Sequence, residues 1–109
     1  MKTRLFNTIL DVVSEVTEVN QAEILSFRKD DEILEARILF VWFCHFNGMH
    51  VPDIMRFLGR KSESSITDKI HDYHSWAATS VMFRLYTKKI AAALPSRIEQ
   101  VAESDTLTT

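Results

Sequence analysis

The chain has 109 residues, which is enough for one domain with one modest hydrophobic core. Hydrophobic residues make up 46% of it and charged residues 26%, a balance that excludes a disordered or collagen-like chain. It holds only 2 glycines and 2 prolines, and this scarcity of turn residues disfavours a β-sandwich or barrel. The net charge of −2 counts against a nucleic-acid partner, unless the basic residues gather on one face.

Apolar residues recur at helical spacing along most of the chain. This pattern predicts an all-α bundle of about six helices, over residues 3–19, 22–27, 31–46, 51–59, from Ser62 or Ser64 to His74, and 77–94. No repeat or linker is visible, so residues 1–100 are expected to form one domain. Residues 101–109 are polar and rich in Ser and Thr, and we expect a flexible tail there.

The third predicted helix is apolar around most of its C-terminal half, which is typical of a helix at the centre of a domain. We expect Cys44 to be a small core hydrophobe there. Core packing is also predicted for the aromatic side chains Phe40, Trp42, Phe43, Phe46 and Phe57. In the last helix, which Pro95 is expected to stop, the predicted apolar side is formed by Val81, Met82, Leu85, Ile90 and Leu94.

Residues 51–74 have the pattern of a helix-turn-helix motif, with two helices joined by a turn that contains Gly59. In such a motif the N-terminal end of the second helix projects into the major groove of DNA. Hydroxyl side chains that could bond phosphates or base edges lie near that end, namely Ser62, Ser64, Ser65 and Thr67. Four basic residues flank the same region, namely Arg56, Arg60, Lys61 and Lys69.

Several short motifs follow one another in a distinctive order. They are Glu23-Ile24-Leu25-Ser26-Phe27-Arg28-Lys29, Ala36-Arg37-Ile38-Leu39, His50-Val51-Pro52-Asp53-Ile54 and Leu58-Gly59-Arg60-Lys61-Ser62-Glu63-Ser64-Ser65-Ile66. In order and spacing they resemble the C-terminal DNA-binding domain of the bacterial replication initiator DnaA. That family has Asp-Leu-Leu-Ser-Lys-Arg-Arg, Pro-Arg, Ser-Leu-Pro-Glu-Ile and Phe-Gly-Gly-Arg-Asp-His-Thr-Thr-Val at the corresponding places. The resemblance covers residues 10–93.

The resemblance implies a double-stranded DNA partner and a role in replication initiation or transcription control. It places Lys29, with Arg28, in the minor groove. It places Ser62, Glu63 and Ser64 against bases in the major groove, and Lys61, Ser65 and Arg37 near phosphates. The sequence departs from the family where Glu63 and Asp68 replace His, and where Asp30, Asp31 and Glu32 follow the basic loop. The DNA site that the family recognises is therefore not assumed for this chain.

The alternative is a protein-interaction module that has lost DNA contact and that forms a homodimer or binds a protein through its last helix. An exposed patch of Trp76, Met82 and Phe83 would favour it. His71 and His74, three residues apart, could share a metal ion, but no Cys-x-x-Cys pair supports this and no metal or cofactor is predicted. No nucleotide loop, nucleophile elbow or carboxylate pair is present, so no enzyme is predicted. The single cysteine and the lack of a signal peptide or long apolar run predict a cytoplasmic protein without a membrane anchor.

Overall fold

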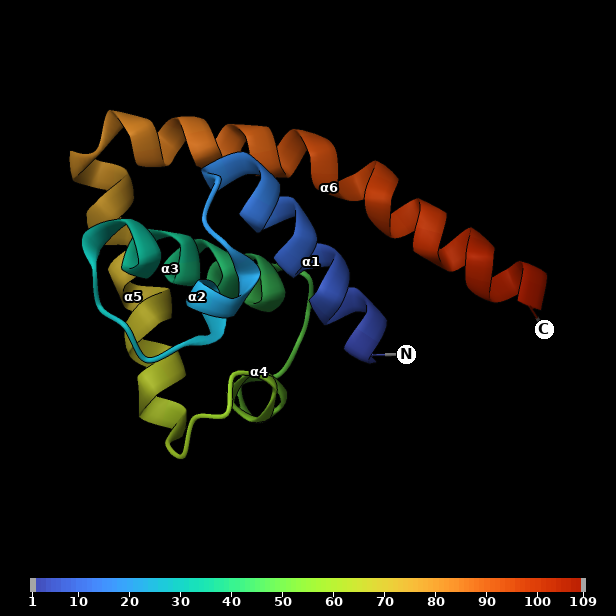
Figure 1. Cartoon of the computed structure of the whole chain (residues 1–109), viewed down its shortest axis with the longest axis horizontal. Coiled ribbons are helices and arrows are strands. Elements are labelled where there is room, and N and C mark those ends of the chain that lie inside the picture. Colours follow the sequence, from blue (N-terminus) through green and yellow to red (C-terminus); the bar gives the residue numbers. More distant parts are fainter. Residues whose placement is uncertain (1, 109) are drawn as a thin grey trace.

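The computed structural model describes the backbone of residues 2–108 and the side chains of residues 3–99. In this part of the chain there are six helices and no strands, which confirms the all-α prediction (Figure 1). The helices are α1 (Lys2–Thr17), α2 (Gln21–Leu25), α3 (Asp31–Phe46), α4 (Val51–Phe57), α5 (Glu63–Thr79) and α6 (Val81–Thr108). Together they make a compact globule around α3, from which the C-terminal part of α6 extends (Figure 1).

Helix α3 lies at the centre, as its sequence predicts. Four consecutive residues, Ile38 to Val41, are each 0% exposed. Because four residues span a full turn, every side of the helix is covered at this point. The covering elements are α1, α2, α4 and α5, while α6 runs along α1 (Figure 1). Cys44 is also buried in α3, as predicted, and burial raises the pKa of its thiol well above the usual value.

Both glycines end helices in the same way. Gly48 and Gly59 have φ values of 83° and 67°, a left-handed conformation that a residue with a Cβ atom adopts at a cost. After Gly48 the backbone N–H of Met49 donates to the carbonyl of Cys44 at 3.1 Å. After Gly59 the N–H of Arg60 donates to the carbonyl of Met55 at 2.9 Å. These are the hydrogen bonds of Schellman caps, and the second one sets the turn between α4 and α5.

The boundary between the last two helices differs from the prediction. Helix α5 continues past His74 to Thr79, and α6 begins at Val81 instead of Ala77. Ser80 separates them, and its hydroxyl accepts a hydrogen bond from the N–H of Phe83 at 3.1 Å. Serine is a preferred N-cap residue, so Ser80 was a local signal for the boundary.

Helix α6 corrects one further prediction. Pro95 lies inside the helix, which continues to Thr108 instead of stopping at the proline; the flexibility predicted for residues 101–109 stays a prediction. Proline has no N–H to donate to the carbonyl of Ala91, four residues before it. Ala91 and Pro95 are both exposed, so water can bond that carbonyl instead. The helix changes direction along its length, as expected when it contains proline (Figure 1). None of the helices described is long and apolar enough to cross a membrane.

The side of α6 that packs inward also differs from the predicted one. Ile90 and Leu94 are buried as predicted, but Val81, Met82 and Leu85 are 66%, 53% and 46% exposed. Phe83 is buried instead, and its ring packs on those of Tyr73 and Trp76. Phe83, Ile90 and Leu94 are seven and four residues apart, so the helical period places them on one face.

Most of the predicted aromatic core is present. Phe40 and Phe43 are buried, Phe57 stacks on Phe6 with centroids 4.5 Å apart, and Trp42 stacks on Tyr73 at 3.9 Å. Phe46 is the exception, because its side chain is 71% exposed at the C-terminal end of α3. In this last turn Phe43 and Cys44 are buried while His45 and Phe46 are exposed, so the end of the helix is covered on one side only.

Replacement of Phe83 by alanine should lower the free energy of unfolding by about 3–5 kcal/mol, because it removes a fully buried aromatic side chain. Met82→Ala, at the neighbouring exposed position, is the matched control and should change it by less than about 0.5 kcal/mol. Urea denaturation followed by circular dichroism measures both. Equal losses in the two variants would contradict the observed orientation of α6.

Candidate nucleic-acid interface

The turn between α4 and α5 presents the predicted recognition residues. Helix α4 is seen end-on in Figure 1 while α5 lies across the view, so the two axes cross steeply, as in a helix-turn-helix. Ser62 is the N-cap of α5, with its hydroxyl accepting from the N–H of Ser64 at 3.2 Å. Its Oγ atom also lies 2.6 Å from that of Ser64. The side chains of Lys61, Ser62, Glu63 and Ser64 are all exposed at this end of the helix.

The loop between α2 and α3, residues 26–30, carries the predicted minor-groove residues. Ser26 shapes its start, since its hydroxyl donates to the Glu23 carbonyl at 2.6 Å and accepts from the Arg28 N–H at 3.2 Å. The Arg28 guanidinium pairs with Asp30 at 2.7 Å and approaches Glu23 at 4.0 Å. Arg28 is therefore largely neutralised within its own loop. Lys29 is exposed and makes no ion pair with any residue whose side chain is described.

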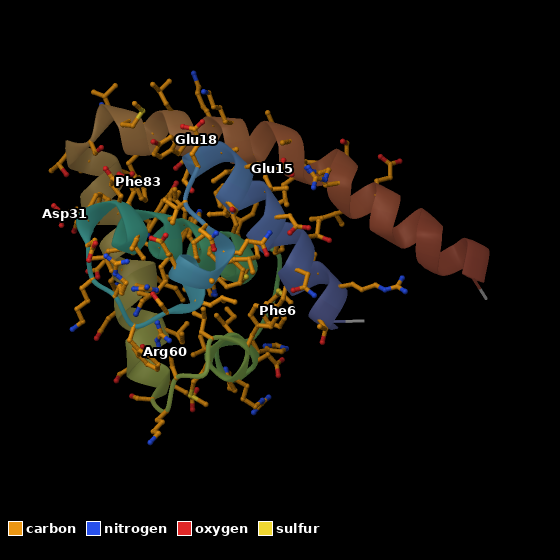
Figure 2. The ribbon with its side chains drawn as sticks, viewed as in Figure 1. Phe6, Glu15, Glu18, Asp31, Arg60 and Phe83 are labelled. Atoms are coloured by element: carbon orange, nitrogen blue, oxygen red, sulfur yellow. The ribbon has the colours of Figure 1, made fainter. Side chains whose placement is uncertain are left out.

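Arg60 joins this loop to the turn. One of its terminal nitrogens donates to the carbonyl of Ser26 at 2.7 Å, and the other donates to the carbonyl of Leu58 at 2.8 Å. The guanidinium also lies over the ring of Phe27, 4.1 Å from its centroid. Figure 2 shows Arg60 where the loop after α2 approaches the start of α5. These contacts hold the two predicted DNA-binding segments, 34 residues apart in sequence, at a fixed distance from each other.

Arg37 occupies a different place from the one that the resemblance implies. It is only 2% exposed, so in this structure it does not reach the surface where a phosphate would lie. Its Nε atom donates to the carbonyl of Ile24 at 2.8 Å and a terminal nitrogen donates to that of Glu23 at 3.2 Å. Both carbonyls lie in the last turn of α2, where the Glu23 carbonyl also accepts from the N–H and the hydroxyl of Ser26. Arg37 thus fixes the end of α2, immediately before the loop.

Lys69 completes a cluster of three cations with Arg37 and Arg60. The Lys69 ammonium is half-buried and donates to the Ser65 carbonyl at 3.2 Å, with the Ser65 hydroxyl 3.5 Å away. Burial, and then the charges of Arg60 and Arg37, lower the pKa of Lys69. Burial and the charge of Arg60 likewise lower the pKa of Arg37. Asp68 and Asp72 oppose the effect on Lys69 only in part, so the cluster keeps a positive potential that a bound anion would relieve.

The remaining predicted site residue, Arg56, is paired with an acidic residue, unlike the cations of this cluster. It is exposed on α4 and forms an ion pair with Asp53 on the same helix. Five of the predicted cations thus make no ion pair with the residues whose side chains are described: Lys29, Arg37, Arg60, Lys61 and Lys69. We call these five residues the basic cluster.

Acidic residues gather elsewhere on the molecule. Glu18, Glu32 and Glu35 lie close enough to Tyr86 to raise the pKa of its phenol, after the larger effect of burial. Burial, and then the charges of Glu32 and Asp31, raise the pKa of Glu35 in the same region. Figure 2 shows Glu18 and Asp31 well separated from Arg60. The cations around Arg60 therefore lie apart from these carboxylates, although Glu63, Asp68 and Asp72 are exposed on α5 beside Lys69 and Lys61.

Other predicted sites find less support in the geometry. Within the part of the chain whose side chains are described, no three His, Cys, Asp or Glu residues lie close enough to hold a metal ion. Of the patch required by the interaction-module alternative, Phe83 is buried, Trp76 is half-buried and only Met82 is exposed. No protein-family model and no curated protein matches the chain.

The sequence did not single out Phe27, which is 72% exposed beside the basic cluster. Its signal was an apolar residue inside a charged loop, at a place where the resembling family has Lys. The sequence also placed Arg60 only as a flanking cation. Its bond to Ser26 depends on how the loop and the turn come together, which no local pattern records.

Substitution of Arg37 by methionine should lower the free energy of unfolding by about 1–3 kcal/mol, because it removes the donor to the buried Ile24 carbonyl at the end of α2, whereas the Glu23 carbonyl keeps its bonds from Ser26. Lys29→Met removes an exposed, unpaired charge and should change stability by less than about 0.5 kcal/mol. Chemical denaturation of both variants provides the comparison. A loss from Arg37→Met no larger than that from Lys29→Met would show that the guanidinium does not hold α2.

Proposed function

We propose that the chain binds duplex DNA, with the loop of residues 26–30 in the minor groove and the N-terminal end of α5 in the adjacent major groove. The basic cluster is the observation that carries this proposal. Its five cations come from three separate segments and lack ion-pair partners among the described side chains. Four of them, Lys29, Arg60, Lys61 and Lys69, are at least partly exposed, and unpaired cations at the surface suit a polyanion, which releases counterions when it is bound.

The members of the cluster would act in different ways. Lys29 and Lys61 are exposed and would contact phosphates directly. Arg60 and Lys69 are half-buried and would add positive potential beneath them. Arg37 would be a positioning residue, since it holds the end of α2 from which the loop starts.

Base recognition would come from the first turn of α5. Ser62, Glu63 and Ser64 are exposed there, at the positive end of the helix dipole. A serine hydroxyl can bond several base edges and so specifies little alone. Glu63 can accept a hydrogen bond from the amino group of cytosine, whereas near a phosphate it would repel. We therefore expect a sequence preference with cytosine opposite Glu63, in a protein of replication or transcription control.

Duplex binding should depend steeply on salt. If Lys29, Arg60, Lys61 and Lys69 each neutralise a phosphate, a plot of log K against log salt should have a slope of about −3 to −4. Fluorescence anisotropy of a labelled random duplex pool, titrated at several salt concentrations, measures this slope. Absence of binding even at low salt would contradict the proposal and favour the interaction module, for which Val81, Met82 and Leu85 offer an exposed apolar surface.

Two substitutions should separate phosphate contact from base recognition. Lys61→Ala should weaken binding to all duplexes alike and reduce the magnitude of the salt slope by about 1. Ser64→Ala should mainly reduce the preference among sequences selected from the pool. Lys89→Ala, an exposed lysine on α6, is the matched control and should change neither property. Equal losses on every duplex for both site variants, or no loss for either, would contradict the assignment.

A further inference from the structure

Phe27 is a large apolar side chain in a surface loop, and neither the fold nor the proposed phosphate contacts explain it. It is 72% exposed between Ser26 and the charged pair Arg28 and Lys29. Its ring does not enter the aromatic core and makes no ring–ring contact with any described residue. An exposed phenylalanine side chain within a charged loop contributes little to the stability of the fold. We therefore expect a ligand to bury it.

The ring is nevertheless held in place. The Arg60 guanidinium covers one face at 4.1 Å and is itself fixed by the carbonyls of Ser26 and Leu58. Ser26, the residue before Phe27, is anchored to Glu23, whose carbonyl also accepts from Arg37. The loop therefore presents the ring on a rigid base, with most of its surface open to a partner. Such a fixed ring loses little conformational entropy on binding.

The charges around the ring restrict what that partner can be. Lys29 and Arg60 lie beside Phe27 without an acidic partner among the described side chains, so an apolar group on an anionic polymer fits better than an apolar protein surface. Stacked bases between phosphates have this character. Minor-groove proteins insert apolar wedges such as Phe or Leu between base steps and kink the duplex.

We propose that Phe27 is an intercalating wedge, which enters a base step of duplex DNA from the minor groove and bends the duplex. This inference rests on the proposed duplex binding and adds a distortion of the DNA to it. The Arg60 guanidinium stays on the outer face of the ring, so that Arg60, Phe27 and a base pair form one stack. Flexible pyrimidine–purine steps, which unstack easily, are the preferred insertion points.

The test uses the full chain and a duplex that carries 2-aminopurine at a central TA step and a donor–acceptor dye pair at its ends. The wild-type protein should raise 2-aminopurine fluorescence and shorten the distance between the dyes. Phe27→Ala should lose both signals and bind about 5- to 100-fold more weakly, as expected for the loss of one stacking contact. Phe27→Leu, which keeps an apolar wedge, should retain part of both signals.

Phe46→Ala is the matched control, because Phe46 is exposed to the same degree, at 71% against 72%, but lies at the far end of α3 from the loop. It should bind and bend the duplex as the wild type does. Unchanged melting temperatures for the Phe27 variants would show that the exposed side chain is not needed for folding.

Failure of the wedge and failure of the proposed function give different results. No binding of the wild type at low salt refutes duplex binding and the wedge together. Salt-dependent binding of the wild type, with Phe27→Ala binding and bending equally well, refutes the wedge alone. Weaker binding by Phe27→Ala without a change in 2-aminopurine fluorescence also refutes it, because the ring then packs on the outside of the duplex. Tighter binding to single-stranded DNA that depends on Phe27 refutes it in favour of stacking on unpaired bases.

Discussion

The apolar surface of α3 is the constraint on which the rest of the structure depends. A helix that must be covered on every side requires neighbours around its full circumference, and α1, α2, α4 and α5 supply them. The short helices α2 and α4 each cover part of α3. Their connections, the loop of residues 26–30 and the turn after Gly59, are brought to the same side of the molecule, where Arg60 links them.

This arrangement brings buried and half-buried cations together, which is electrostatically unfavourable. Burial, and then the charges of Arg60 and Arg37, lower the pKa of Lys69, and burial with the charge of Arg60 lowers the pKa of Arg37, so these charged groups lie in an unfavourable environment. Hydrogen bonds to backbone carbonyls compensate Arg37 and Arg60, but no carboxylate pairs with either among the described side chains. An anion beside them would relieve the repulsion. Groups whose pKa values are perturbed by burial and by neighbouring charges are frequently found at functional sites, which is consistent with the proposed role.

Net charge alone does not describe how the charges of this chain are placed. Glu18, Glu32 and Glu35 lie around Tyr86, while Arg60 and Arg37 lie close enough to Lys69 to lower its pKa, after the larger effect of burial. Arg28 and Arg56, which appear equivalent to the others in the sequence, are neutralised by Asp30 and Asp53. The proposed interface is mixed in charge, because Glu63, Asp68 and Asp72 are exposed on α5 beside its cations.

The sequence by itself determined the helical class, the central position of α3 and the turn that contains Gly59, because helical periodicity, an all-round apolar surface and left-handed glycine are local properties. It also located most candidate site residues near the turn. Only the tertiary structure decided that Arg37 is buried, that Phe83 faces inward while Phe46 does not, and that Arg60 joins two segments and covers Phe27. Those outcomes depend on which helices meet and where each one ends, and a pattern within one helix does not contain that information.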